Sequence, residues 1–217
     1  MTSLPHILLV NVFFAPHSYG GATVVAEEVA AALHSAGQAR VTVVSMCSRG
    51  DLPPYHILRS QTGGVVNLMI NLPRGRSFSE IYSNPQVSEH IARLMDQLAP
   101  DVVHAHCVQD IGAGFMAEAA ARGIPLVLSV HDFWWICSRQ FMIRPDQGYC
   151  GQNPVKLDTC RSCVENFSTA RTRADYLKRQ AALADVITYP SQFAMDLCKN
   201  SGLNRKKSLV WADHELA

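Results

Sequence analysis

HILLVNVFF (residues 6–14), APHSYGG (15–21) and ATVVAEEVAAALHSAG (22–37) follow one another near the amino terminus and decide the fold. The first segment is an almost unbroken apolar run, which is typical of a strand buried on both faces of a parallel sheet. The third places Val25, Val29 and Leu33 at helical spacing and stops at Gly37. Together they predict a strand, a glycine-bearing loop and a helix.

The same alternation continues along the chain. Further strands are predicted at 41–47, 65–72, 101–107, 125–132, 185–191 and 206–211, and helices at 84–100, 111–122, 168–183 and 191–202. Residues 48–64 are polar and carry Pro and Gly, so we expect a surface loop there. Strands alternating with helices predict an α/β fold: a doubly wound, mostly parallel Rossmann-like sheet with helices on both faces.

The 217 residues fit one domain, with an aromatic and cysteine-bearing insertion at 133–166 that is too long for an ordinary connection. Seven cysteines, an odd number, occur without a secretory signal, which favours a reducing compartment. We therefore expect a cytoplasmic protein. It lacks an apolar run of membrane-spanning length, so membrane contact would be at most peripheral, at the inner face.

The sequence has almost no net charge, which excludes a partner that binds through overall electrostatic attraction. Nineteen Lys and Arg residues stand against eighteen Asp and Glu, so the sequence gives no reason to expect nucleic-acid binding. Arg171, Arg173, Lys178 and Arg179 gather in one predicted helix. They fit a solvated face better than a phospholipid-binding one, although both interpretations remain open.

Ligands of an open parallel sheet bind beyond the carboxyl ends of its strands, so the loop at 15–21 is a candidate site. Gly20 and Gly21 precede a helix, where free backbone N–H groups attract a phosphate; a tight turn would also explain both glycines. His17 lies in the same loop. The chain has neither a GxxxxGK[ST] nor a GxGxxG motif, which disfavours a P-loop or a dinucleotide fingerprint.

Two pairs of polar residues lie in other predicted strands. His131 and Asp132 end the strand at 125–132, where a histidine can donate to a phosphate or sugar oxygen or simply satisfy a backbone carbonyl. His104 and His106 alternate with an alanine and so share one face of their strand. For these two we expect a structural role.

Four cysteines in the insertion, Cys137, Cys150, Cys160 and Cys163, end in a CxxC pair. Four thiolates suit a tetrahedral structural zinc that braces a loop with little core of its own. Free thiols and a redox pair are the alternatives, and all three stay open. We expect Cys47, Cys107 and Cys198 to be core residues.

In that order, ILLVNVFFAPHSYGGATVVAEEVAAAL, PDVVHAHC, GIPLVLSVHDFWWIC and DVITYPSQFAMDL make the chain resemble the N-terminal, acceptor-side domain of glycosyltransferase family 4, which has the GT-B fold. The resemblance implies transfer of a sugar from a nucleotide-sugar donor to a sugar, lipid-linked or other acceptor, with retention and without a catalytic metal. Members with an aromatic and cysteine-bearing loop commonly serve cell-surface polysaccharide or glycolipid biosynthesis.

The resemblance also implies roles for single residues. Gly20 and Gly21 match the loop that approaches the donor phosphates, with His17 beside it, and His131 matches the catalytic histidine that contacts the transferring sugar and phosphate. Asp132 would orient His131 or its loop.

One part of the family pattern is missing from the sequence: the C-terminal nucleotide-sugar domain with its basic pair and Glu-x7-Glu motif. We therefore expect activity to need such a domain in trans or in a longer chain. A non-catalytic acceptor-binding or assembly module and a zinc-braced nucleotide-binding regulator are the alternatives.

Overall fold

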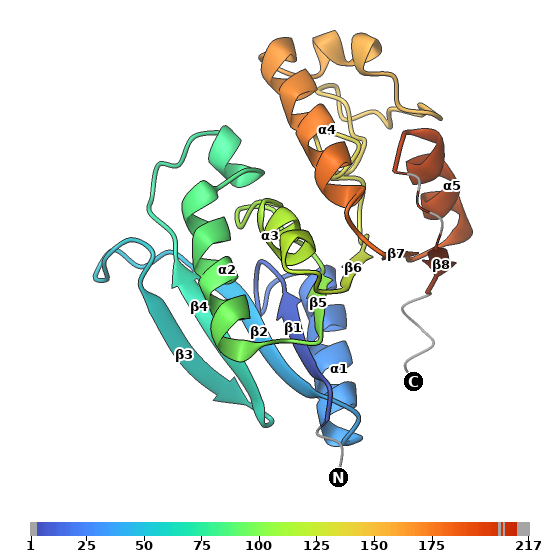
Figure 1. The fold of residues 1–217 in the computed structure, drawn as a ribbon. Coiled ribbons are helices and arrows are strands. Elements are labelled where there is room, and N and C mark those ends of the chain that lie inside the picture. Colours follow the sequence, from blue (N-terminus) through green and yellow to red (C-terminus); the bar gives the residue numbers. More distant parts are fainter. Residues whose placement is uncertain (1–3, 204, 206, 212–217) are drawn as a thin grey trace. The chain divides into compact units, whose positions relative to one another are not determined.

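The structure is a computed structural model that describes residues 4–203, 205 and 207–211. Its strands form one sheet in the order β3-β4-β2-β1-β5-β6-β7-β8, with helices between them in the sequence. The strand pairings β1–β2, β1–β5, β2–β4 and β7–β8 are parallel, and β3–β4 is antiparallel. The predicted fold class, a mostly parallel Rossmann-like α/β sheet, is confirmed (Figure 1).

The strands are β1 (His6–Val10), β2 (Arg40–Cys47), β3 (Ile57–Thr62), β4 (Val65–Asn71), β5 (Val102–Ala105), β6 (Leu126–Ser129), β7 (Val186–Tyr189) and β8 (Ser208–Val210). The helices are α1 (Gly21–Ser35), α2 (Pro85–Leu98), α3 (Phe115–Ala121), α4 (Phe167–Ala181) and α5 (Gln192–Asn200), with short 3-10 helices η1 (Ser79–Ile81) and η2 (Leu157–Ser162). None of the described helices is both long enough and apolar enough to span a membrane.

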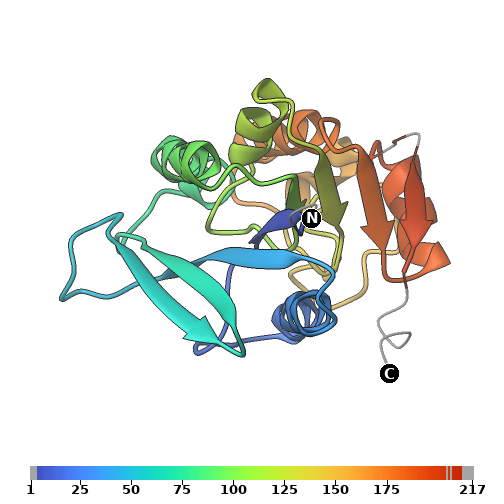
Figure 2. The ribbon, with the colours of Figure 1, turned by 60° about the horizontal axis from the view of Figure 1, so that its bottom comes forward.

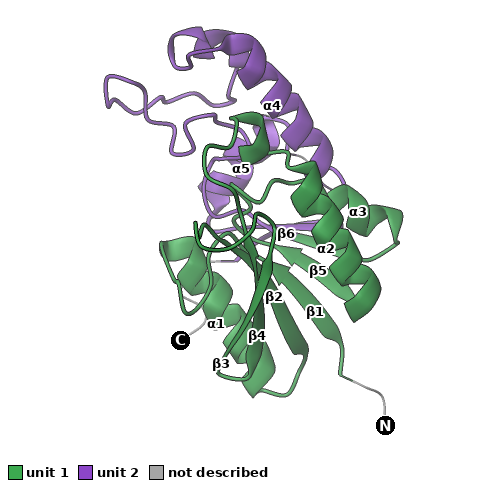
Figure 3. Ribbon diagram, turned by 90° about the vertical axis from the view of Figure 1, so that its left-hand side faces the viewer, with its two compact units in different colours: residues 1–127, 216 green, residues 128–215, 217 purple. Residues whose placement is uncertain are grey.

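The chain divides into two compact units, unit 1 at residues 1–127 and unit 2 at residues 128–215 (Figure 3). The boundary falls inside β6, and the insertion at 133–166 belongs wholly to unit 2. The assignment of the chain to one domain stays a prediction.

Unit 1 is built on the strand, loop and helix with which the sequence begins. Helix α1 covers one face of its strands, and α2 and α3 cover the other (Figure 2). Side chains of β1, β2, β4 and α1 form one buried apolar cluster that includes Leu9, Ala26, Ala30, Val43 and Val65. Burial on both faces explains why these strands read as nearly continuous apolar runs.

Helix α2 shows how local sequence sets an element's ends. The Asn84 side chain accepts a hydrogen bond from the backbone N–H of Val87 at 3.2 Å, and Pro85 occupies the first turn. The predicted apolar face is buried at Val87 and Ile91. The helix ends at Ala99, which adopts a left-handed conformation with φ of 44°.

The surface loop predicted at 48–64 is wrong in its second half, where the structure has strand β3. Ile57–Thr62 pairs antiparallel with β4 through a two-residue turn of Gly63 and Gly64, whose φ angles are 56° and 86°. Two central residues with positive φ are typical of a hairpin turn. The strand lies at the sheet edge and is largely exposed, so its polar composition concealed it.

Unit 2 has its own buried residues on β7, α4 and α5, among them Ile187, Tyr189, Leu177 and Leu197. Helix α5 begins as predicted after Ser191, whose Oγ accepts a hydrogen bond from the N–H of Ala194 at 3.2 Å. Burial raises the pKa of the Cys198 thiol to about 12, in keeping with the core position predicted for it.

Phe115, the first residue of α3, is fully buried, so Phe115→Ala tests the packing of unit 1. We expect the change to lower the free energy of unfolding by about 3–5 kcal/mol, since it removes a large apolar group and leaves a cavity. Phe78→Ala is the matched control, because Phe78 is 45% exposed, and its effect should stay below about 1 kcal/mol. Urea unfolding of both variants measures this; equal losses would contradict the packing described here.

Candidate functional site

The glycine loop joins β1 to α1 in unit 1. Gly20 is the residue before the helix and has a φ of 84°, and Gly21 is the first helical residue. No described side chain caps this helix end. A Cβ atom added at Gly20 or Gly21 would meet no described atom within 4 Å. Within the first turn of α1, the N–H groups of Thr23 and Val24 bond the Gly20 carbonyl at 3.1 and 3.3 Å, which leaves those of Gly21 and Ala22 as the donors for an anion at this helix N-terminus.

Glycine occupies positions 20 and 21 for different physical reasons. Gly20 needs its positive φ, a conformation that other residues adopt at a cost. Gly21 has neither a positive φ nor a close neighbour, and glycine is a poor helix former. Neither backbone conformation nor described packing accounts for glycine at 21, whereas close approach of a ligand would.

An open pocket of about 760 Å³ lies beside this loop. It is lined by Phe13, His17, Tyr19, Met46, Cys47, Ser48 and Arg49. The structure thus brings the predicted His17 to a pocket formed by the glycine loop and the end of β2. Its size is in the range of small-molecule sites, and its wall is mostly apolar with one guanidinium group at Arg49.

Asn11, a residue that the sequence analysis did not single out, fixes the glycine loop. It is fully buried, and its Nδ2 donates to the Phe13 carbonyl at 2.6 Å and to Thr23 Oγ1 on α1 at 3.3 Å. Its Oδ1 accepts from the N–H of Cys107 at 2.9 Å. One side chain therefore links the ends of two strands to the first turn of α1. The clue was visible: Asn11 is the one amide inside the apolar run at 6–14.

In unit 2, His131 and Asp132 follow β6, and both are half-buried. The Val130 N–H donates to the Thr188 carbonyl at 2.9 Å, which continues the pairing with β7 up to the histidine. Asp132 accepts from the backbone N–H of Trp134 at 2.7 Å and from Gln140 Nε2 at 2.6 Å. These bonds favour the loop-orienting interpretation of Asp132.

Arg173 on α4 is a correction to the expected solvated basic face. It is only 2% exposed, its guanidinium lies 4.7 Å from the centre of the Trp134 ring, and it donates to the Trp134 carbonyl at 2.6 Å. Contact with an aromatic ring can hold a guanidinium out of water. Helical spacing alone did not show that this arginine faces the turn after Asp132.

The strand pair His104 and His106 is buried, at 8% and 1% exposure, with ring centroids 4.1 Å apart. This agrees with the shared face and the structural role expected for them. Cys47 and Cys107, expected in the core, are only half-buried, because Cys47 is the last residue of β2 and Cys107 lies in the loop two residues after β5.

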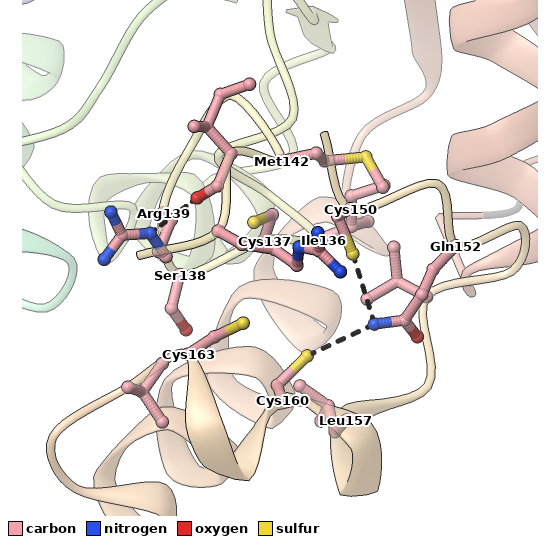
Figure 4. Close-up of a pocket in the computed structure, with 14 residues that line it drawn as sticks. Ile136, Cys137, Ser138, Arg139, Met142, Cys150, Gln152, Leu157, Cys160 and Cys163 are labelled. Carbon is pink, nitrogen blue, oxygen red and sulfur yellow. Dashed lines mark hydrogen bonds between the residues drawn. The ribbon is translucent and has the colours of Figure 1, made fainter. Parts of the chain in front are cut away.

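Cys137, Cys150, Cys160 and Cys163 come together in unit 2, where all four line one small cavity (Figure 4). Among the described residues, however, no three His, Cys, Asp or Glu side chains already stand where one metal ion would hold them. The structural zinc thus stays a prediction.

We predict that Asn11→Ala loosens the glycine loop, since the Cys107 N–H and the Phe13 carbonyl both lose a buried partner. A buried polar group without a partner costs about 1–3 kcal/mol, and amide hydrogen exchange at residues 12–20 should accelerate. Asn153→Ala removes a surface amide bonded to Asn200, and serves as the control that leaves this exchange unchanged. Unaltered exchange in Asn11→Ala would show that the side chain does not hold the loop.

Solved structures of other proteins are similar to this fold. No curated protein sequence matches the chain. A sucrose-phosphate synthase from Thermosynechococcus elongatus matches at TM-score 0.57 and 11% identity, over 96% of this chain and 48% of its own. A UDP-forming α,α-trehalose-phosphate synthase from Burkholderia vietnamiensis matches at TM-score 0.54 and 14% identity, over 97% and 49%.

The chain thus spans about half the length of the solved structures it matches, and these likenesses show the fold. The sequence match is more specific, because the family model for Glycosyltransferase Family 4 covers residues 19–212, from the glycine loop past the last strand. The chain belongs to glycosyltransferase family 4.

Proposed function

We propose that this chain is the acceptor-side half of a retaining glycosyltransferase that moves a sugar from a nucleotide-sugar donor to an acceptor. The observation that carries the proposal is the uncapped, glycine-bearing N-terminus of α1, which opens beside the pocket of unit 1. Because the chain spans about half of the structures it matches, the proposal includes a second half that binds the nucleotide.

The first turn of α1 is suited to the donor diphosphate. The N–H groups of Gly21 and Ala22 and the positive end of the helix dipole stabilise negative charge. Charge on the diphosphate increases as the bond to the sugar breaks, so a group fixed in place beforehand stabilises the transition state more than the ground state. In this proposal Gly21 lets the phosphate approach the backbone, and Gly20 supplies the turn.

We assign to His131 the contact with the transferring sugar and its phosphate. A histidine can donate a hydrogen bond to a sugar hydroxyl or phosphate oxygen while adjacent groups fix its orientation. Asp132 acts on the turn behind it through Trp134 and Gln140. In this scheme His131 is the catalytic residue, whereas Asp132 is a positioning residue.

We place the acceptor in the pocket of unit 1. Its apolar wall suits the apolar portion of an acceptor, and Arg49, two residues after β2, would exchange its present pairing with Asp51 at 2.5 Å for a negatively charged group of that acceptor. A lipid-linked acceptor has this chemistry, and would bring the protein to the inner face of a membrane for polysaccharide or glycolipid assembly. A purely sugar acceptor would leave most of the apolar wall uncovered.

The first test of catalysis pairs the chain with a C-terminal glycosyltransferase half, sought in the coding sequence directly downstream. Release of nucleoside diphosphate from a panel of UDP-, GDP- and ADP-sugars should require both halves, and should fall at least about a hundredfold in His131→Ala, as for loss of a strong transition-state contact. His56→Ala, an exposed histidine of unit 1, is the control and should keep full activity.

Two results would overturn this proposal. The first is a pair of halves that binds no nucleotide sugar. The second is the absence of any downstream half that carries a Glu-x7-Glu motif. Either would favour the alternative, a non-catalytic acceptor-binding module with the same fold.

Gly21→Ala separates a ligand role from a role in folding. Alanine is the better helix former, so the free energy of unfolding should stay level or rise by up to about 1 kcal/mol. Transfer should nevertheless fall about tenfold or more, equivalent to about 1.4 kcal/mol, because the added methyl group obstructs the phosphate. Ser35→Ala, at the exposed end of α1, should change neither quantity. A Gly21→Ala variant with normal transfer would mean that no ligand approaches this residue.

A further inference from the structure

The insertion in unit 2 has a defined backbone but almost no core. Between residues 137 and 166, Met142 is the only side chain among the buried hydrophobic residues. The segment is nevertheless ordered by a tight hairpin, in which Ile143 pairs with Tyr149 and the Arg144 N–H donates to the Gly148 carbonyl at 2.8 Å. Apolar burial contributes little to this loop, which is bonded to the rest of unit 2 by polar contacts such as Arg171–Asp158 at 2.7 Å and Val155 N–H to Ser201 Oγ at 2.9 Å, and a bound ion would add to them.

The four cysteines of the loop are its shared feature. Cys137 ends the turn after β6, Cys150 follows the hairpin, and Cys160 and Cys163 lie in and just after η2. All four line a cavity of about 20 Å³, room for one water molecule or one metal ion (Figure 4). Three parts of the insertion therefore bring Cys137, Cys150 and the Cys160–Cys163 pair to the same cavity.

We propose that Cys137, Cys150, Cys160 and Cys163 bind one structural Zn²⁺ that cross-links the insertion. Four thiolates form the tetrahedral site that zinc prefers, and thiolates select a soft cation over Mg²⁺ or Ca²⁺. The site is structural because four protein ligands leave no position open for a substrate. It is independent of the proposed transferase activity, and its test needs no substrate.

The Gln152 amide contacts two of the four sulfurs. Its Nε2 lies 3.4 Å from Cys150 Sγ and 3.8 Å from Cys160 Sγ, and donates to both sulfurs (Figure 4). A zinc ion bound by these two sulfurs would replace the weak hydrogen bonds, and its coordination by all four cysteines would need a rearrangement of the ligand set. The rearrangement involves side chains, because the Cys163 N–H already bonds the Cys160 carbonyl at 2.9 Å and shapes the CxxC turn.

The surrounding charge favours thiolates once an ion is bound. Arg139 and Arg144 line the same cavity, where Arg139 donates to the Ile143 carbonyl at 2.6 Å and Arg144 pairs with Asp146 at 3.1 Å. A four-thiolate zinc site carries a net charge of about −2, which these guanidinium groups offset. A cysteine binds zinc as its thiolate and so must lose its proton. Zinc binding therefore releases protons, and zinc occupancy should decrease as the pH falls.

The test is the metal content of the chain purified under reducing conditions without a chelator. We expect about one zinc per chain by elemental mass spectrometry, as for one four-cysteine site. Cys150→Ser and Cys160→Ser should lose it. Cys107→Ser, a half-buried cysteine in unit 1, is the matched control and should keep the full stoichiometry.

Because a serine variant could simply fail to fold, the wild-type chain supplies a second readout. Cobalt exchanged into the site should show the charge-transfer absorption of a tetrahedral thiolate complex. Trp134, Trp135 and Trp211 all lie in unit 2, so their fluorescence reports that unit alone. Chelation should lower the melting temperature seen by fluorescence, and added zinc should restore it.

Three results would overturn the zinc site. One is a folded wild-type chain that contains no zinc and is not stabilised by added zinc. Another is retention of one zinc per chain in both serine variants. The third is thiol labelling that finds these cysteines joined in disulfides after purification without reductant, which would indicate a redox pair instead.

Discussion

The burial of parallel strands on both faces is the constraint on which the rest of unit 1 depends. Strands β1, β2 and β5 pair in parallel, with α1 on one face and α2 and α3 on the other. Their backbone N–H and C=O groups pair within the sheet, and the residues that follow each strand lie at its edge. Because parallel strands end at one edge, β1 and β2 both contribute their following residues to the same pocket.

Single buried polar side chains then fix the loops that this arrangement exposes. Asn11 ties the glycine loop to Cys107 and Thr23, and Asp132 ties the turn after β6 to Gln140. In each case both polar atoms of the side chain form hydrogen bonds with groups in loops or near strand ends. A loop restrained in this way can hold a ligand-binding backbone in place without an apolar core beneath it.

The insertion of unit 2 is also a loop with little apolar core beneath it, but the restraint proposed for it is of a different kind. Its anchor at the β6 side is the stacked pair of Trp134 and Arg173, but beyond Cys137 the loop extends away from any apolar layer. A metal cross-link would give this segment the stability that burial gives the rest of the fold.

The sequence by itself determined the fold class and most of the elements, because strands buried on both faces and helices with one apolar face leave strong periodic patterns. It also selected His17, Gly20, Gly21 and the four cysteines, since these residue types stand out locally. Tertiary structure alone decided the features that depend on neighbours distant in sequence. Strand β3 is polar and exists because β4 offers it an edge, and Arg173 is buried because Trp134 stacks on it. Periodicity records which face of an element is buried, but not which single polar group finds a partner there.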